Sequence, residues 1–227
     1  MELEGKTALV TGGGGGIGEG IAIALAKAGA DVMIADLDVE IARETATRVE
    51  ETGRRSGAFQ VDVSDPESVN ELIDSVVAQA GQLDIAVNNA GVLSIGSVDE
   101  LSIDDWDWIM KVNAKGVFLC SQAELAVMRP RRFGRIINVA SIAGKVGFPD
   151  LSHYTASKFA VIGFTNAIAK EVAAEGVTVN ALCPGIVGTG MWRGEDGLAG
   201  RWRHEGETEA ESWERHQKTL LPQGEAQ

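Results

Sequence analysis

The 227-residue sequence carries 33 acidic and 20 basic side chains, and its net charge of −13 argues against unassisted binding to nucleic acid or to an anionic membrane. A hydrophobic content of 44% supports a sizeable core, and the length suits a single α/β domain spanning residues 1–227. With no apolar run of about 18 residues, no apolar leader and only two cysteines, the sequence predicts a soluble, cytoplasmic protein.

Short β-branched, apolar runs alternate with longer segments of helical period from residue 6 to about residue 183. Each run is almost continuously hydrophobic, as is typical of a strand covered on both faces. Because crossovers are right-handed, we expect a doubly wound, Rossmann-type parallel sheet in the order 3-2-1-4-5-6. The predicted strands are Thr7–Val10, Asp31–Ala35, Gly57–Val61, Asp84–Asn88, Arg135–Val139 and Thr178–Leu182.

A glycine-rich loop, residues 11–18, follows the first expected strand and precedes the helix-forming run Ile21–Lys27. Glycines let the backbone approach a pyrophosphate, whose charge is stabilised by the unpaired N–H groups at a helix N-terminus. A lone glycine-rich loop is a weak signal, but here the strand and the helix that it requires are both present. The predicted cofactor contacts in this loop are Gly12, Gly15, Gly16, Ile17 and Gly18.

Asp36 ends the second expected strand, about twenty residues beyond the loop, where dinucleotide-binding folds place a ribose-binding acid. A carboxylate there accepts hydrogen bonds from the ribose hydroxyls and repels a 2′-phosphate, which favours NAD over NADP. The next residues, Leu37 and Asp38, bring no cation to offset that repulsion. The alternative role, capping of the following helix, suits Asp38 equally well and Asp36 less.

The sole tyrosine, Tyr154, lies one helical turn before Lys158 and downstream of Ser141. A free phenol titrates near ~10, too high for a base at neutral pH, and an ammonium on the same helix face favours the ionised phenol. The pair therefore predicts a proton-transfer site with a lowered tyrosine pKa. Taken alone, the spacing favours a solvated surface pair, and the alternative role of Ser141 is a helix N-cap.

Together these motifs resemble the classical short-chain dehydrogenases/reductases over residues 5–192. The loop fits the family pattern TGxxxGxG, and further motif residues stand in the family's order along the chain. These are Asp62-Val63, Asn88-Asn89-Ala90-Gly91, Asn113, Ser141, Tyr154-x-x-x-Lys158 and Pro184-Gly185 with Thr189.

The resemblance implies a catalytic set of Asn113, Ser141, Tyr154 and Lys158. Tyr154 would be the general base in oxidation and the general acid in reduction. Lys158 would also bind the nicotinamide ribose, Ser141 would bind the substrate oxygen, and Asn113 would anchor a water that relays protons. The implied NAD contacts outside the glycine loop are Asp36, Leu37, Asp62, Val63, Asn89, Ala90, Gly91, Tyr154, Lys158, Pro184, Gly185, Val187 and Thr189.

The resemblance also implies a mostly apolar pocket for a small or medium secondary alcohol or ketone of diol, polyol or sugar-like type. Its expected lining is Ile142, Ala143, Val146, Phe148, Met191 and Trp192. One alternative is a 3-oxoacyl-(acyl carrier protein) reductase, which more often uses NADP. Another is a non-catalytic NAD-binding regulatory protein. No metal site is expected, because His204 and His216 lack a ligand pattern.

Residues 188–222 are acidic and contain Trp192, Trp202 and Trp213, which predicts a substrate lid or, alternatively, a poorly ordered acidic loop. In the lid, Trp213, Leu220 and Leu221 would lie on the inner side of a short helix. Family domains continue with a further helix and a seventh strand, without which the sixth strand would be an uncovered apolar edge. We therefore expect an omitted tail, the alternative being a truncated form.

A stripe of small residues runs along the Tyr154 helix. It would pack either against the chain's own sheet or against a partner helix in a homo-oligomer, a dimer or tetramer as is common in the family. The stripe consists of Ala156, Ala160, Gly163 and Ala167.

Overall fold

The fold is seen in a computed structural model that describes residues 2–195 and 197–220. Six parallel strands form one sheet in the order β3-β2-β1-β4-β5-β6, which confirms the predicted doubly wound architecture. Every predicted strand lies within one residue of its observed bounds. The strands are β1 (Thr7–Thr11), β2 (Asp31–Asp36), β3 (Ser56–Gln60), β4 (Ile85–Asn88), β5 (Gly134–Val139) and β6 (Val177–Leu182).

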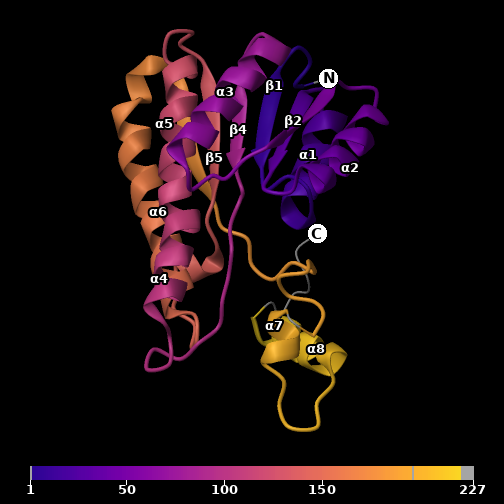
Figure 1. Ribbon diagram of the computed structural model, residues 1–227, viewed down its shortest axis with the longest axis vertical. Coiled ribbons are helices and arrows are strands. Elements are labelled where there is room, and N and C mark those ends of the chain that lie inside the picture. Colours follow the sequence, from indigo (N-terminus) through magenta and orange to yellow (C-terminus); the bar gives the residue numbers. More distant parts are fainter. Residues whose placement is uncertain (1, 196, 221–227) are drawn as a thin grey trace. The chain divides into compact units, whose positions relative to one another are not determined.

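Helices cover the two faces of the sheet in two groups (Figure 1). Side chains alternate between the faces along each strand, so in β1 Leu9 joins one core cluster while Ala8 and Val10 join the other. The Leu9 cluster is completed by α3 (Pro66–Ala80), α5 (Gly116–Met128) and α6 (Ser152–Glu171), and the other cluster by α1 (Gly16–Lys27) and α2 (Val39–Glu50).

Short sequence signals set the helix ends. Asp65 caps α3, Pro66 occupies its first turn, and Gly81 ends it in the left-handed conformation. A short helix, α4 (Ile103–Met110), begins after the capping Ser102. It continues through a single π-helical turn, Lys111–Lys115, into α5. Such turns are rare in proteins overall, and those that occur are often found at functional sites.

The small-residue stripe of α6 faces outward. Ala160, Gly163 and Ala167 are exposed, and a Cβ added at Gly163 would meet no atom within 4 Å. The alternative that the stripe packs on the chain's own sheet is therefore wrong. Within the described residues, β6 pairs with β5 alone, and its Leu182 is exposed.

The chain divides into two compact units, Met1–Leu182 and Cys183–Gln227. The second unit contains α7 (Leu198–Arg201) and α8 (Glu209–Leu220), which confirms the short helix expected around Trp213. Trp213 is buried with Ile186 and Ala199, and Trp192 packs against them. Leu221 and the side chain of Leu220 lie outside the described part of the chain. The role of this unit as a lid stays a prediction.

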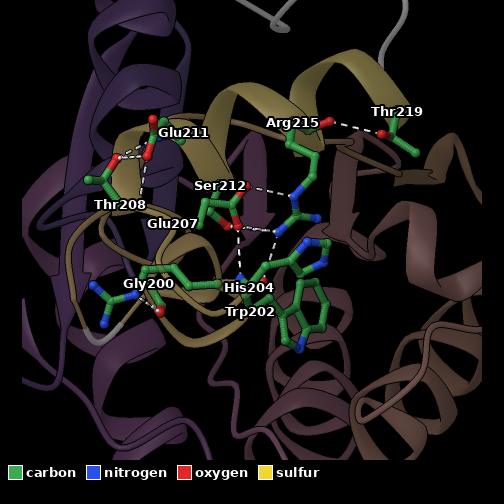
Figure 2. A network of polar contacts seen from close by, with 10 residues as sticks. Gly200, Trp202, His204, Glu207, Thr208, Glu211, Ser212, Arg215 and Thr219 are labelled. Atoms are coloured by element: carbon green, nitrogen blue, oxygen red, sulfur yellow. Dashed lines mark hydrogen bonds and ion pairs between the residues drawn. The ribbon is translucent and has the colours of Figure 1, made fainter.

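Polar contacts gather on the outside of the second unit around Arg215 (Figure 2). The Arg215 guanidinium donates to both carboxylate oxygens of Glu207, at 2.9 and 2.8 Å, and to the carbonyl oxygen of Trp202. The backbone N–H of His204 donates to the same Glu207 carboxylate. An ion pair thus closes the loop between α7 and α8.

No helix in the described residues is both long and apolar enough to cross a membrane. Across residues 2–195 and 197–220, no three His, Cys, Asp or Glu side chains gather in a way that would hold a metal ion.

Candidate active site

The predicted site residues of the first unit follow the carboxyl ends of its strands. The glycine loop follows β1, Asp36 ends β2, Asp62 follows β3, Asn89 follows β4 and Ser141 follows β5. Because the strands are parallel, these ends share one edge of the sheet, beside the point between β1 and β4 where the strand order reverses. Open α/β sheets bind their ligands at this position.

The glycine loop leaves the start of α1 open. Gly15 is the N-cap and supplies no side-chain hydrogen bond, so the first N–H groups of the helix are available to an anion. A Cβ at Gly15 would meet nothing within 4 Å, whereas a Cβ at Gly18 would lie 2.1 Å from the carbonyl oxygen of Gly12. The loop therefore packs tightly on one side and stays accessible on the other, as a dinucleotide pyrophosphate requires.

The Asp36 carboxylate is hydrogen bonded to the backbone of the glycine-rich loop and of its own turn. One carboxylate oxygen accepts from the Gly14 N–H at 3.0 Å and the other from the Asp38 N–H at 3.4 Å. Asp38 itself caps α2 through the Glu40 N–H, so the capping role weighed for Asp38 is confirmed. Leu37, between the two acids, is exposed.

Thr11 and Asn89 link the loop to the end of β4. The Asn89 amide donates to the carbonyl oxygens of Thr11 and Gly12, at 3.1 and 2.8 Å. The buried Thr11 hydroxyl accepts from the N–H groups of Asn89 and Ala90. Asn89 thus holds the loop through backbone contacts. Thr11 was not singled out by the sequence, although a polar residue ending a buried strand is the signal that would have found it.

Asp62 is tied to its own turn. Its Oδ1 accepts from the backbone N–H of Ser64 and from the Ser64 hydroxyl, at 2.9 and 2.6 Å. The hydroxyl hydrogen bond is the main reason why the pKa of Asp62 is lowered. The neighbouring Val63 is buried against Gly116 of α5. Asp62 is exposed and ionised at the sheet edge, where its predicted contact with adenine stays a prediction.

Asn113 occupies the π-helical turn and is fully buried. Its Oδ1 accepts from the Val92 N–H at 2.8 Å, and its Nδ2 donates to the Val92 carbonyl oxygen and to the Ser157 hydroxyl. Asn113 therefore joins the loop after β4 to α6. A Cβ at Gly91 would lie 3.3 Å from Asn113 Oδ1 and 3.5 Å from Lys158 Nζ, so these groups converge. The water-anchoring role of Asn113 stays a prediction.

Ser141, Tyr154 and Lys158 meet at the start of α6. The Ser141 hydroxyl lies close enough to the Tyr154 phenol to lower its pKa, and Ser141 Oγ accepts from the Ala143 N–H. The N-cap role weighed for Ser141 is thus confirmed, and its hydrogen bond to the substrate oxygen stays a prediction. Lys158 Nζ lies 5.6 Å from the centre of the Tyr154 ring and donates to the Val139 carbonyl oxygen at 3.0 Å. Tyr154 and Lys158 are both buried, which contradicts the solvated surface pair.

Burial raises the pKa of Tyr154, because a phenolate in a low-dielectric environment is poorly solvated, and the Ser141 hydrogen bond lowers it in part. This direction is opposite to the lowering expected from the sequence. The reason is that helical spacing reports the neighbouring lysine but not the depth of the ring. Lowering of this pKa by Lys158 when NAD is bound stays a prediction.

His153 has a partner that the sequence did not reveal. It is fully buried, and its Nε2 lies 2.7 Å from the Ser94 hydroxyl in the loop after β4. Local sequence spacing gives no sign of this pair, since its two members lie 59 positions apart.

The remaining predicted NAD contacts belong to the second unit. Pro184, Gly185 and Val187 form an irregular segment after β6, and a turn follows in which Thr189 accepts from the N–H groups of Trp192 and Arg193. Their contact with the nicotinamide stays a prediction.

Comparisons with a family model and with curated relatives indicate the same protein family. A family model described as short chain dehydrogenase matches residues 6–197. An L-2,3-butanediol dehydrogenase of Corynebacterium glutamicum is 44% identical over 195 residues, covering 82% of this chain and 74% of the relative. A 3-oxoacyl-[acyl-carrier-protein] reductase of Thermotoga maritima is 36% identical over 191 residues, covering 84% of this chain and 78% of the relative.

Solved structures agree with the sequence comparisons. The crystal structure of an NAD⁺-bound xylitol dehydrogenase superposes with a TM-score of 0.82 at 34% identity, covering 84% of this chain and 74% of that one.

Proposed function

Because the chain belongs to the short-chain dehydrogenase family, we propose that it is an NAD-dependent oxidoreductase acting on a small or medium secondary alcohol of diol, polyol or sugar-like type. The observation that carries the proposal is the meeting of Ser141, Tyr154 and Lys158 at the end of β5 and the start of α6. A hydroxyl donor, a phenol and an ammonium in one buried site are the groups needed to move a proton to or from a carbinol oxygen.

In the oxidation, Tyr154 Oη takes the hydroxyl proton of the alcohol while the C–H bond breaks and the C=O bond forms. Ser141 donates a hydrogen bond to the substrate oxygen, on which charge develops. Bound NAD⁺ would accept the hydride that leaves the carbinol carbon. In the reverse direction, Tyr154 returns the proton to the ketone oxygen. Because burial raises the pKa of Tyr154, oxidation gains rate as the pH rises and reduction as it falls.

The choice of NAD rests on Asp36 and the open start of α1. The Asp36 carboxylate lies against the Gly14 backbone and projects a negative charge where a 2′-phosphate would have to sit. The similarity to an NAD⁺-bound xylitol dehydrogenase supports the same choice.

The direct test is NADH formation at 340 nm with NAD⁺ and a panel of secondary alcohols that includes 2,3-butanediol and linear polyols. We expect turnover of at least one diol or polyol and a clear preference for NAD⁺ over NADP⁺. Saturable NADH binding without turnover across the panel would instead support the non-catalytic NAD-binding protein.

A 3-oxoacyl reductase is the second candidate, favoured by the 36% identity to the Thermotoga maritima reductase. Acetoacetyl-CoA with NADPH distinguishes the two. Reduction of that thioester faster than of a simple hydroxyketone with NADH would overturn the diol proposal.

We further propose a cytoplasmic homo-oligomer, a dimer or tetramer, that uses the outward face of α6. The small residues Ala160, Gly163 and Ala167 lie beside the exposed Phe159, and the exposed Phe118 lies on the neighbouring α5. Light scattering of wild type and Gly163→Arg tests this, with a shift of the variant towards monomer as the expected result.

A further inference from the structure

The loop after β4 approaches α6 and the residues just before it at three successive points. Asn113 and Lys158 lie against Gly91, the Ser94 hydroxyl contacts His153, and the Gly96 N–H donates to the Asp150 carbonyl oxygen at 3.0 Å. Ser94 is the middle point. It is half-buried and lies next to the residue that precedes Tyr154 on the helix, at the end of the molecule where the reaction would occur.

The proton on His153 decides what the Ser94 hydroxyl can do. The imidazole has no exposed surface, and burial lowers its pKa, so the ring is neutral and carries one N–H. Within the described residues, Nδ1 has no hydrogen-bond partner, whereas Nε2 contacts Ser94 Oγ. Orphaned buried N–H groups are rarer than under-satisfied acceptors, which places the proton on Nε2.

With the proton on Nε2, His153 donates and Ser94 Oγ accepts. The Ser94 O–H is then free to donate elsewhere, and no second partner for it is found among residues 2–195 and 197–220. A hydroxyl that is held from behind by a buried ring and keeps its own proton is a pre-organised donor for a ligand oxygen.

We propose that Ser94, positioned by His153, donates a hydrogen bond to a second oxygen of the substrate, close to the reacting carbon. The preferred substrates are therefore vicinal diols and α-hydroxyketones rather than simple alcohols and ketones. This inference rests on the proposed oxidoreductase function and names its specificity-determining side chain. His153 is a positioning residue, because it acts through Ser94.

The test compares two alcohols that differ by one hydroxyl, 2,3-butanediol and 2-butanol. Ser94→Ala should lower kcat/KM for the diol roughly tenfold and for 2-butanol less than about twofold, as expected for the loss of one hydrogen bond. Ser97→Ala is the matched control, since Ser97 lies in the same loop and its hydroxyl donates to Glu100 at 3.1 Å. Equal losses on both alcohols, or no loss on either, would overturn the proposal.

Rescue and spectroscopy separate a positioning role from a structural one. His153→Gln keeps an N–H donor and should retain most of the diol preference, whereas His153→Phe should lose it. In the ¹⁵N NMR spectrum of the imidazole rings, assigned by comparison with His153→Gln, we expect the Nε2–H tautomer. An Nδ1–H tautomer contradicts the proposal independently of any activity.

The wild-type assays also distinguish a failure of the proposed oxidoreductase function from a failure of the Ser94 proposal. If the wild type oxidises neither 2,3-butanediol nor 2-butanol nor any other alcohol of the panel, the oxidoreductase proposal fails and the recognition role fails with it. If it oxidises both equally well, the oxidoreductase proposal stands and the Ser94 proposal alone is wrong.

Discussion

The two units of the chain hold their polar side chains in different ways. In the first unit, a buried network joins four elements: Asn88 of β4 donates to Glu124 of α5 and to Asn138 of β5, and Asn138 donates to Thr165 of α6. In the second unit, the network around Arg215 is built on a partly exposed pair of charged groups (Figure 2).

The two networks have different roles. The buried hydrogen bonds of the first unit position functional groups, whereas the ion pair of the second unit closes the loop between α7 and α8. In a low-dielectric interior, a hydrogen bond is strong and an unpaired group is costly, so the buried network fixes β4, β5 and α6 relative to one another. Asn89 follows β4, Ser141 follows β5 and Tyr154 lies on α6. Partly exposed ion pairs such as Glu207–Arg215 contribute modestly, and the second unit depends more on its tryptophan cluster. Changes in the first unit should therefore have the larger effects.

The largest effect is expected at the phenol itself. Tyr154→Phe removes the proton-transferring oxygen and keeps the ring, so turnover should fall by about three orders of magnitude while NADH binding persists. Steady-state rates at 340 nm and NADH fluorescence titration measure the two properties. A variant that keeps more than about a tenth of the wild-type turnover would remove the assignment of Tyr154 as acid and base, given the usual size of such effects.

The next effect concerns stability. Burial raises the pKa of Glu124 to about 8 from its ordinary 4.5. Between these values the unfolded chain releases the proton while the folded protein keeps it. The stability contribution of the neutral acid is therefore fully present below pH 4.5 and is lost as the pH rises towards 8. From pH 5 to pH 8, this acid should lower the wild-type unfolding free energy by about 3 to 4 kcal/mol, and Glu124→Gln should remove that part of the decline.

Urea unfolding at both pH values measures this decline. Glu71→Gln on α3 is the matched control, because the Glu71 side chain is exposed and burial does not penalise its charge. If wild type and Glu124→Gln respond identically to pH, the acid is already ionised in the folded state and the buried network is charged rather than neutral.

A smaller effect is expected in cofactor choice. Asp36→Asn keeps the shape of the side chain and removes its charge, so the ratio of kcat/KM for NADP⁺ to that for NAD⁺ should rise by about tenfold, equivalent to about 1.4 kcal/mol. Asp38→Asn is the control two residues away, since asparagine caps a helix as well as aspartate does. A ratio that moves equally in both variants would show a general charge effect and not a contact with the ribose.

Much of the first unit was predictable because its signals are local. The six strands follow from apolar runs, and the glycine loop from its strand and helix context. The Tyr154 site follows from helical spacing together with the surrounding family motifs. The burial of Tyr154 and the pairing of His153 with Ser94 depend on tertiary packing and were not predictable. Glu124 had a usable signal, because it is the only charged residue in the mostly apolar α5. In the second unit, Trp213 was correctly placed inside, but the pairing of Glu207 with Arg215 was not foreseen.

The smallest effect is expected from that ion pair. The Arg215 hydrogen bonds lower the pKa of Glu207 to about 2, so the pairing is present above the ordinary value of 4.5 and is lost as the pH falls towards 2. Above pH 5, Glu207→Gln should raise the rate of tryptic cleavage within the second unit roughly two- to threefold at low salt. About 0.5 M NaCl should abolish the difference, because it screens exposed charges. Glu205→Gln, in the same exposed loop, is the control. A larger, salt-independent increase would mean that this network holds the second unit as firmly as buried hydrogen bonds hold the first.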